Sequence, residues 1–390
     1  MKGKNLLILV LLAVVLAALA ILTSRKEKEL APDLPGRYVL PDLPVNDIEK
    51  IVVYSEQSTV TVTRVDNVWL SPDKFNYSVD FGKVREFLLK LAELRIGQVV
   101  QVDNDERSEL KMISPLMKLP SDSHRIGTLV ELHGKGDKKQ ASLLVGDTHQ
   151  RKTQGRGISF GGYPDGHYVS PDNGETVYLV TETLDDLPRD VKNWLDTNLV
   201  NVPSSDIKEV TISGPRRDTV RLTRKKNGGD LDVEGLSAKE ETDSSKLQGI
   251  ESALSYFRFD DIADPSITEK ELGLGKPVVF KAVTQKNEVY TVNIGGSPKG
   301  SDNRYVRIEV ALEKPDKPVL PAAETEGEKK DSSPDSEKKQ ADERKEFEEK
   351  IKALNEKLRK WTYLVVSYKT DSMTTTRNDL VKKKEKKKEE

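Results

Sequence analysis

Three residues in the first half of the chain could act as metal ligands. Asp147 and His149 are separated by one residue, and His167 follows in what we expect to be the neighbouring arm of a β-hairpin. Carboxylate oxygens and imidazole nitrogens bind zinc, and three protein ligands leave one position for a reactive water. A D-x-H pair alone carries little information, and a second copy of the surrounding pattern has glycine, proline and arginine at these positions. Two interpretations are therefore open, a metal site or histidines that are solvated or hydrogen-bonded, and the second is favoured.

The other residue patterns of catalysis are absent from the sequence. There is no Cys, no G-x-S-x-G turn, and no Ser with an evident His partner. The glycine-rich stretch 155–162 is not followed by the Lys of a phosphate-binding loop, and it falls between two expected strands. The carboxylate pairs Asp185-Asp186 and Asp260-Asp261 lie in polar, turn-like stretches, so we interpret them as solvated. We predict that the protein is not an enzyme and binds no cofactor.

An apolar N-terminal segment determines the environment in which the rest of the chain folds. Residues 6–22 are seventeen apolar residues without a charge, and basic residues flank them on both sides. As a helix they would be ~25 Å long, close to the ~30 Å thickness of a bilayer core. We predict a transmembrane signal-anchor over residues 1–30, and a cleaved secretory signal stays open because Ala18-Leu19-Ala20 resembles a cleavage site. The predicted location is the bacterial cytoplasmic (inner) membrane, with a single pass and the bulk of the chain on the extracytoplasmic side.

The composition limits how the rest of the chain can fold and what it can bind. Its 390 residues suffice for two or three domains of ordinary size. Lys and Arg number 63 and Asp and Glu number 65, so no net field favours a nucleic acid. Because an exported chain without Cys has no disulfides, its domains must be stabilised by their hydrophobic cores.

The chain after residue 45 contains two copies of one pattern. Each copy begins with alternating β-branched residues typical of a strand hairpin, at 47–64 and again at 206–224. An amphipathic helical pattern follows, with apolar residues three and four apart over 84–94 and 247–257. Each copy then has a Glu-Leu pair, two strands that end at a glycine, a Tyr-Val pair and a last strand. The matching segments are Glu109-Leu110 and Glu271-Leu272, Val145-Gly146 and Ile294-Gly295, Tyr168-Val169 and Tyr305-Val306, and 177–180 and 362–365.

A charged insert, 313–360, separates the last two strands of the second copy. Residues 315–340 contain four Pro among many Glu and Lys, so we predict that they are disordered. Residues 341–360 are predicted to form a helix whose apolar stripe packs on its own unit, binds a partner as a coiled coil, or belongs to a marginal helix. The four residues of the stripe are our candidates for binding a partner: Phe347, Ile351, Leu354 and Leu358.

The predicted fold class is α+β. It consists of one N-terminal transmembrane helix and two tandem duplicated units, each an antiparallel sheet with a packed amphipathic helix. The units are predicted over 45–203 and 204–381, with a linker at 31–44 and a Lys- and Glu-rich tail at 382–390. A period of ~160 residues is too long for a solenoid, so the repeat indicates domain duplication.

The order of these motifs resembles the DUF4340 family. The shared elements are a short N-terminal transmembrane helix, D-I-x-x-I at 47–51, W-x-φ at Trp69, E-L-x-φ-x-x-P at 109–115, and the glycine, Y-V and V-Y-x-V segments above. The second copy lacks the Trp and splits its last hairpin. The family is of uncharacterised function and has no assigned catalytic residues. The resemblance implies an accessory protein of gliding-type ABC transport systems, whose partners are a permease, an ATPase and a large extracytoplasmic subunit.

We therefore predict a non-catalytic, membrane-anchored accessory or scaffold protein of an ABC-type envelope transport complex. It would bind other proteins on the extracytoplasmic side and the membrane through residues 6–22. One alternative is an envelope metal-dependent hydrolase that uses Asp147, His149 and His167, which stoichiometric zinc would favour. The other is a secreted solute- or glycan-binding module, which would need a deep pocket lined by aromatic residues.

Overall fold

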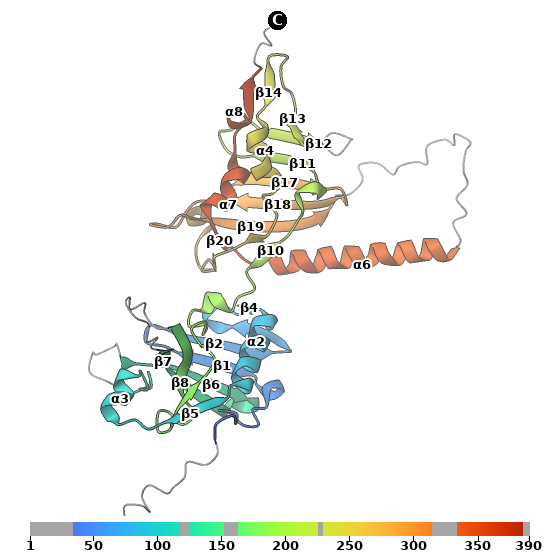
Figure 1. The fold of residues 1–390 in the computed structure, drawn as a ribbon. Helices are drawn as coiled ribbons and strands as arrows, with labels where there is room; N and C mark the ends of the chain where they lie inside the picture. Colours follow the sequence, from blue (N-terminus) through green and yellow to red (C-terminus); the bar gives the residue numbers. More distant parts are fainter. Residues whose placement is uncertain (1–33, 118–124, 152–162, 225–228, 314–333, 385–390) are drawn as a thin grey trace, which may run out of the picture. The chain divides into compact units, whose positions relative to one another are not determined.

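The computed structural model describes residues 34–117, 125–151, 163–224, 229–313 and 334–384, without the side chains of 334–341. The chain forms two compact units, which meet in sequence between Asp196 and Thr197. We call them unit 1 and unit 2 and describe each by itself (Figure 1).

Unit 1 is built around a nine-stranded sheet in the order β4-β3-β2-β1-β6-β7-β8-β9-β5. All neighbouring strands are antiparallel. Its elements are β1 (Lys50–Tyr54), β2 (Thr59–Val65), β3 (Val68–Ser71), β4 (Tyr77–Ser78), α2 (Phe81–Glu93), β5 (Ile96–Val100), α3 (Asn104–Glu109), β6 (Thr128–Gly134), β7 (Lys138–Arg151), β8 (Tyr163–Ser170) and β9 (Val177–Val180), with short 3₁₀ turns between them.

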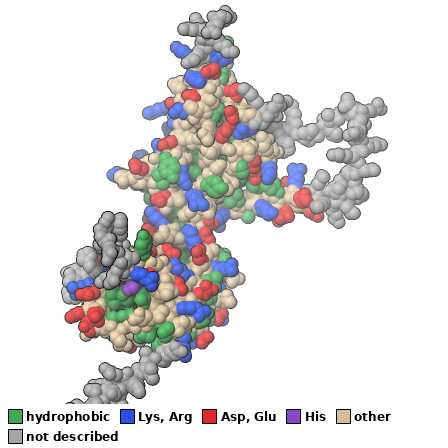
Figure 2. All heavy atoms as spheres, in the orientation of Figure 1, with side chains coloured by type: hydrophobic (Ala, Val, Ile, Leu, Met, Phe, Trp, Pro, Cys, Tyr) green, Lys and Arg blue, Asp and Glu red, His purple; other side chains and the backbone are tan. Residues whose placement is uncertain are grey.

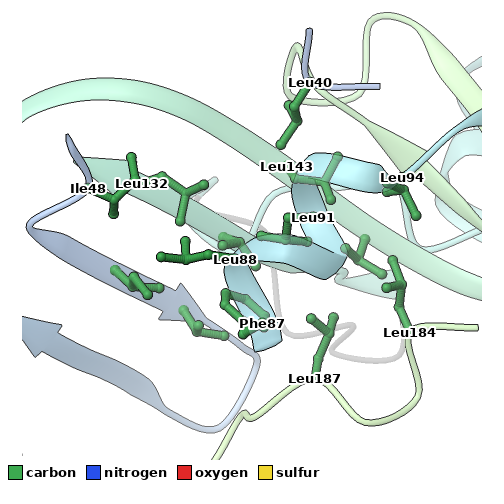
Figure 3. Packing of buried hydrophobic residues seen from close by; sticks show 14 of the residues in the cluster. Leu40, Ile48, Phe87, Leu88, Leu91, Leu94, Leu132, Leu143, Leu184 and Leu187 are labelled. Carbon is green, nitrogen blue, oxygen red and sulfur yellow. The ribbon is translucent and has the colours of Figure 1, made fainter. Parts of the chain in front are cut away.

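One helix, α2, covers the core of unit 1. It begins after Asp80, whose side chain accepts hydrogen bonds from the first free backbone N–H groups of the helix. Its buried face consists of Val84, Phe87, Leu88 and Leu91, spaced three and four apart as the sequence predicts. Figure 3 shows Leu88 and Leu91 among side chains of the sheet, including those of β6 and β7. Helix and sheet therefore share one hydrophobic core.

Unit 2 is built around an eight-stranded sheet in the order β13-β12-β11-β17-β18-β19-β20-β16, again antiparallel throughout. Two small sheets, β10–β15 and β14–β21, accompany it. The elements are β10 (Asn198–Val200), β11 (Ile207–Ser213), β12 (Val220–Arg224), β13 (Leu231–Val233), β14 (Glu240–Thr242), α4 (Ser244–Glu251), β15 (Phe257–Arg258), β16 (Asp261–Ile262), α5 (Glu269–Leu272), β17 (Val278–Thr284), β18 (Glu288–Ile294), β19 (Asn303–Leu312), α6 (Pro334–Leu358), β20 (Tyr363–Val366), α7 (Ser367–Asp371), α8 (Arg377–Leu380) and β21 (Val381–Lys383).

The two large sheets follow the same path. Strands β3-β2-β1-β6-β7-β8-β9-β5 of unit 1 correspond in order and in sequence position to β13-β12-β11-β17-β18-β19-β20-β16 of unit 2. In both units a short helix after the main helix, α3 or α5, begins with a reciprocal capping box. These correspondences allow a residue of one unit to be compared with its counterpart in the other.

The matching Glu-Leu and glycine motifs meet at a close backbone contact. The N–H of Asp147 donates to the carbonyl of Leu110 at 2.9 Å, and that of Gly296 donates to the carbonyl of Leu272 at 2.8 Å. The residue before each donor is a glycine. Because a Cβ at Gly146 would lie 2.3 Å from the Leu110 oxygen, only glycine fits there without a shift of the backbone.

The predicted fold class is wrong. The described chain is mainly antiparallel sheet, with large sheets of nine and eight strands, and the helix of unit 2 that corresponds to α2, α4, has only eight residues. Among the described residues no helix is long and apolar enough to cross a membrane. Residues 6–22, where we predicted the transmembrane helix, lie outside the described residues. The sequence pattern predicted the helices correctly as helices, but their length did not determine the fold class.

The predicted boundaries also change at both ends of unit 1. From residue 34 the predicted linker is part of the unit, because Val39 and Leu40 are buried and the N–H of Val39 donates to the carbonyl of Leu94 at 2.9 Å. At the other end, β10 pairs with β15, so the segment before residue 204 belongs to unit 2. The start of the predicted tail, in turn, forms β21.

The insert helix differs from its prediction in length and in environment. It begins at Pro334, so 334–340 are helical where we predicted disorder, while 315–333 lie outside the described residues. Figure 1 shows its C-terminal end against the sheet of unit 2 and its N-terminal part projecting from it. In this sheet β20 pairs only with the first four residues of β19, and α6 lies along the remaining residues of β19.

The apolar stripe is accordingly not a free surface for a partner. Ile351 and Leu358 are buried in unit 2, and Phe347 and Leu354 are half-buried. Between them, Asn355 Oδ1 accepts a hydrogen bond from the N–H of Val310 on β19 at 3.0 Å. The helix thus covers the part of the β19 edge with which no strand of the described residues pairs.

Candidate functional site

A polar groove of about 890 Å³ lies in unit 1 where β6, β7 and β8 meet the loop after β9. The loop is tied down by Arg189, whose Nε donates to Thr128 Oγ1 at 2.8 Å and whose carbonyl accepts from Ser58 Oγ at 2.7 Å. The charged and polar side chains that line the groove and could do chemistry are Lys111, Asp147, Thr148, His167, Asp185 and Arg189.

His167 is the most deeply buried of these groups, with 2% of its surface exposed. Its Nδ1 accepts a hydrogen bond from the N–H of Leu184 at 3.0 Å, so the proton of the neutral ring must be on Nε2. Nε2 lies 3.1 Å from Thr148 Oγ1, and that hydroxyl donates to Asp185 Oδ1 at 3.0 Å. The three side chains therefore form a chain of donors that runs from His167 through Thr148 to the Asp185 carboxylate.

This direction of hydrogen bonding is the reverse of that in a catalytic triad. A nucleophilic hydroxyl donates its proton to the histidine, and the other ring nitrogen donates to a carboxylate. Here Thr148 donates to Asp185 and accepts from His167, and Nδ1 accepts from a backbone N–H. The Thr148 hydroxyl thus donates to a carboxylate and not to the imidazole.

The buried imidazole predicts a pH dependence of stability. Burial lowers the pKa of His167 below its usual 6.5, and the nearby Asp185 carboxylate opposes this only in part. The unfolded chain then binds a proton near pH 6.5 that the folded chain binds only at lower pH, so the free energy of unfolding of unit 1 should fall as the pH decreases below about 6.5. The slope from this one group is at most about 1.4 kcal/mol per pH unit.

Replacement of the histidine tests this pH dependence. We expect His167→Gln to remove the contribution from the stability profile of unit 1, measured by urea unfolding between about pH 7.5 and 5. The more exposed His149→Gln should retain it. A profile of His167→Gln as steep as that of the unchanged chain would contradict the assignment.

The structure does not bring the three predicted metal ligands together. His149 Nδ1 lies 2.5 Å from Asp165 Oδ1, and Asp147 forms an ion pair with Lys111 at 3.2 Å. Along the β7–β8 ladder His149 is opposite Gly166, whereas His167 is opposite Thr148, the neighbour of His149. Because adjacent residues of a strand point to opposite faces, the two histidines lie on different faces of the sheet. No group of three or more ligand side chains within the described residues could hold a metal ion.

The sequence analysis did not identify two residues of the groove as candidate site residues. Thr148 was passed over between two candidate ligands, and Asp185 was interpreted as solvated. Its carboxylate is indeed 62% exposed, but one oxygen accepts from Thr148 and lies 3.4 Å from His167 Nε2. Thr148 and Asp185 are 37 residues apart, so no local pattern relates them. Asp186, the other member of the pair, lies 2.5 Å from Lys90 of α2.

The surface charge does not single out a polyanion or a polycation as ligand. On the face shown in Figure 2, basic and acidic side chains are interspersed over the described parts of both units. This pattern agrees with the near-zero net charge of the whole chain, −2. Fold and groove together define a duplicated antiparallel-sheet protein in which His167, Thr148 and Asp185 of the groove are hydrogen-bonded to one another.

The comparison with protein families shows to which family the chain belongs. A model of the DUF4340 family, described as a domain of unknown function, matches residues 69–277, so the protein belongs to this family. The match begins in β3 of unit 1 and ends before β17 of unit 2, and therefore includes parts of both units. Comparisons with curated proteins and with solved structures gave no match.

Proposed function

We propose that this protein is a non-catalytic accessory subunit of an ABC-type envelope transport complex. It acts on the extracytoplasmic side by binding other proteins of that complex. The family resemblance supplies the transport system, and the arrangement of the groove supports a role other than catalysis.

The non-catalytic role is supported by one observation, the hydrogen bonds around His167. This buried imidazole is the group best suited to act as a base, and its two nitrogens contact a backbone N–H and the hydroxyl of Thr148. A general base needs a free nitrogen within hydrogen-bond reach of the proton that it removes. Both ring nitrogens are committed to the fold, which supports a structural role for the histidine.

The test is capture of the partners by the full chain in its own cells. We expect a tagged full-length protein, cross-linked before the membranes are solubilised, to enrich an ABC permease and its ATPase at least tenfold over a tagged, unrelated exported protein. Subunit identities and ratios are measured by quantitative mass spectrometry. Enrichment of no ABC component would contradict the proposal.

Metal analysis of the purified protein tests the competing hydrolase. Stoichiometric zinc that is lost in the double variant His149→Ala and His167→Ala would overturn the non-catalytic role. Zinc below a tenth of an equivalent, unchanged in the double variant, would support it.

A further inference from the structure

In unit 2 the strand β18 is paired on both sides from Val289 to Ile294. On one side it pairs with β17. On the other it pairs with β19, from Glu288 opposite Leu312 to Ile294 opposite Val306. Over the residues paired on both sides, nothing of this strand is left open to another chain.

The corresponding strand of unit 1, β7, is paired less completely. Leu144 is opposite Ser170 of β8, just as Asn293 is opposite Arg307 in unit 2. The residues of β7 before this point, 139–143, pair with β6 across one register shift. On their other side no described strand pairs with them. Unit 1 thus has an open edge where unit 2 has the second half of β19.

The chain turns away at the end of β8, which explains the difference. Pro171 follows Ser170 and has no N–H to offer to a ladder. The Ser170 hydroxyl donates to Asp172 Oδ1 at 2.7 Å and accepts from the N–H of Gly174 at 2.8 Å, which fixes the turn toward β9. In unit 2 the chain continues straight through Arg307 to the end of β19.

The open edge forms one side of a groove of about 770 Å³. Ala141 and Ser142 of β7 line it on that side, together with Tyr178 of β9. The opposite side is the segment 34–44, whose Val39 is anchored in the core of unit 1. The groove therefore places an exposed strand edge beside a fixed wall.

The charged side chains in the groove favour an acidic occupant. Arg37 and Arg95 line it, and Asp42 is the single acid among the described lining residues. Arg95 is held in place, because its Nη2 donates to Tyr38 Oη at 2.8 Å and its guanidinium lies 4.3 Å from the centre of the tyrosine ring. In unit 2 the strand at this place carries Glu309 near its middle.

We propose that residues 139–143 of β7 bind an extended, alternating apolar and acidic peptide segment of a partner protein as an added antiparallel strand. Strand addition takes its affinity from main-chain hydrogen bonds and its specificity from alternate side chains. This inference rests on the proposed function, because it names the kind of contact by which an accessory subunit would hold its partner.

The probe for the test comes from the chain itself. A fluorescent peptide with the sequence of residues 305–313, the strand that occupies the corresponding edge in unit 2, is titrated into the full-length protein. We expect saturable binding and slower hydrogen exchange of those backbone amides of 139–143 that point away from β6. A peptide of the same composition in scrambled order serves as the first control.

Backbone methylation gives the decisive comparison. In an antiparallel pair, alternate residues direct their N–H groups toward the partner strand. Two methylated peptides are compared, one N-methylated at Arg307, Glu309 and Ala311, the other at Ile308, Val310 and Leu312. We expect one of them to bind at least tenfold more weakly than the unmodified peptide and the other to bind within about threefold of it. Equal loss or equal retention in the two peptides would overturn strand addition.

Two further outcomes would overturn the inference while the proposed function stands. One is absence of binding by the unmodified peptide. The other is strong protection, in the free protein, of those 139–143 amides that point away from β6, because the open edge would then already be paired. The cross-linking experiment does not involve the peptide, so capture of the ABC subunits together with either outcome would reject the edge and keep the accessory role.

Discussion

Replacement of Gly295 by alanine should lower the free energy of unfolding of unit 2 by about 3 kcal/mol. A Cβ at this position would lie 2.2 Å from the carbonyl oxygen of Leu272 and 3.1 Å from Leu274 Cγ. The obstructing oxygen belongs to the backbone at the end of α5 and accepts the N–H of Gly296 at 2.8 Å. It cannot move aside without loss of that hydrogen bond, so overpacking and hydrogen-bond loss act together.

Gly275→Ala is the matched control for this substitution. Gly275 lies in the same unit, and a Cβ there would meet nothing within 4 Å. Its effect should therefore stay within about 0.5 kcal/mol, as for an ordinary surface change. Urea-dependent hydrogen exchange of the amides of β18 reports the stability of unit 2 in the full chain. Equal effects of the two substitutions would mean that the backbone contact does not constrain the fold.

This contact was accessible to sequence analysis because it occurs twice. The same Leu and Gly appear in the same order in both copies, at Leu110 and Gly146 and again at Leu272 and Gly295, although the chain between them is longer in the first copy. A close approach of two backbones imposes the residue type directly, so the pattern survives in both copies. The strand order also recurs in the two units.

The three candidate ligands do not meet, because the sequence analysis combined one-residue spacing on a strand with an assumed register. Asp147 and His149 do follow each other at the spacing of one strand face, but the ladder places His167 opposite Thr148. The β7–β8 pairing contains register shifts between Val145 and Thr148 and between His149 and Gln150. A bulge cannot be located from alternation alone, and it decides which side chains share a face.

The insert shows a different limit. The apolar spacing of its helix was legible in the sequence, but its docking place was not, because it depends on how far β19 extends beyond β20. That length is set by long-range pairing with β18. The cost of closing the loop would by itself allow an insert between two strands to be removed, but Ile351 and Leu358 of its helix are buried in unit 2.

Leu358→Ala should accordingly destabilise unit 2 by about 3 kcal/mol, as expected for a leucine removed from a closed core. Leu358 is 1% exposed, and its carbonyl accepts a hydrogen bond from the hydroxyl of the buried Tyr363 at 3.2 Å. Leu354→Ala, four residues earlier on the same helix, removes the same atoms from a half-buried site and should cost about 1 kcal/mol. Comparison of the two variants distinguishes the loss of a side chain buried against the sheet from a general loss of helix stability.

The same reasoning predicts that removal of the whole insert destabilises unit 2. Replacing residues 315–360 by a short Gly-Asn turn would delete Ile351 and Leu358 from the core and leave the N–H of Val310 without Asn355. Loop shortening returns only about 2 kcal/mol of closure entropy, less than the loss of two buried side chains and a buried hydrogen bond. Hydrogen exchange of the β19 amides should therefore accelerate in the shortened chain. Unchanged exchange, together with equal effects of Leu358→Ala and Leu354→Ala, would show that α6 contributes nothing to unit 2 and that its stripe is free for a partner after all.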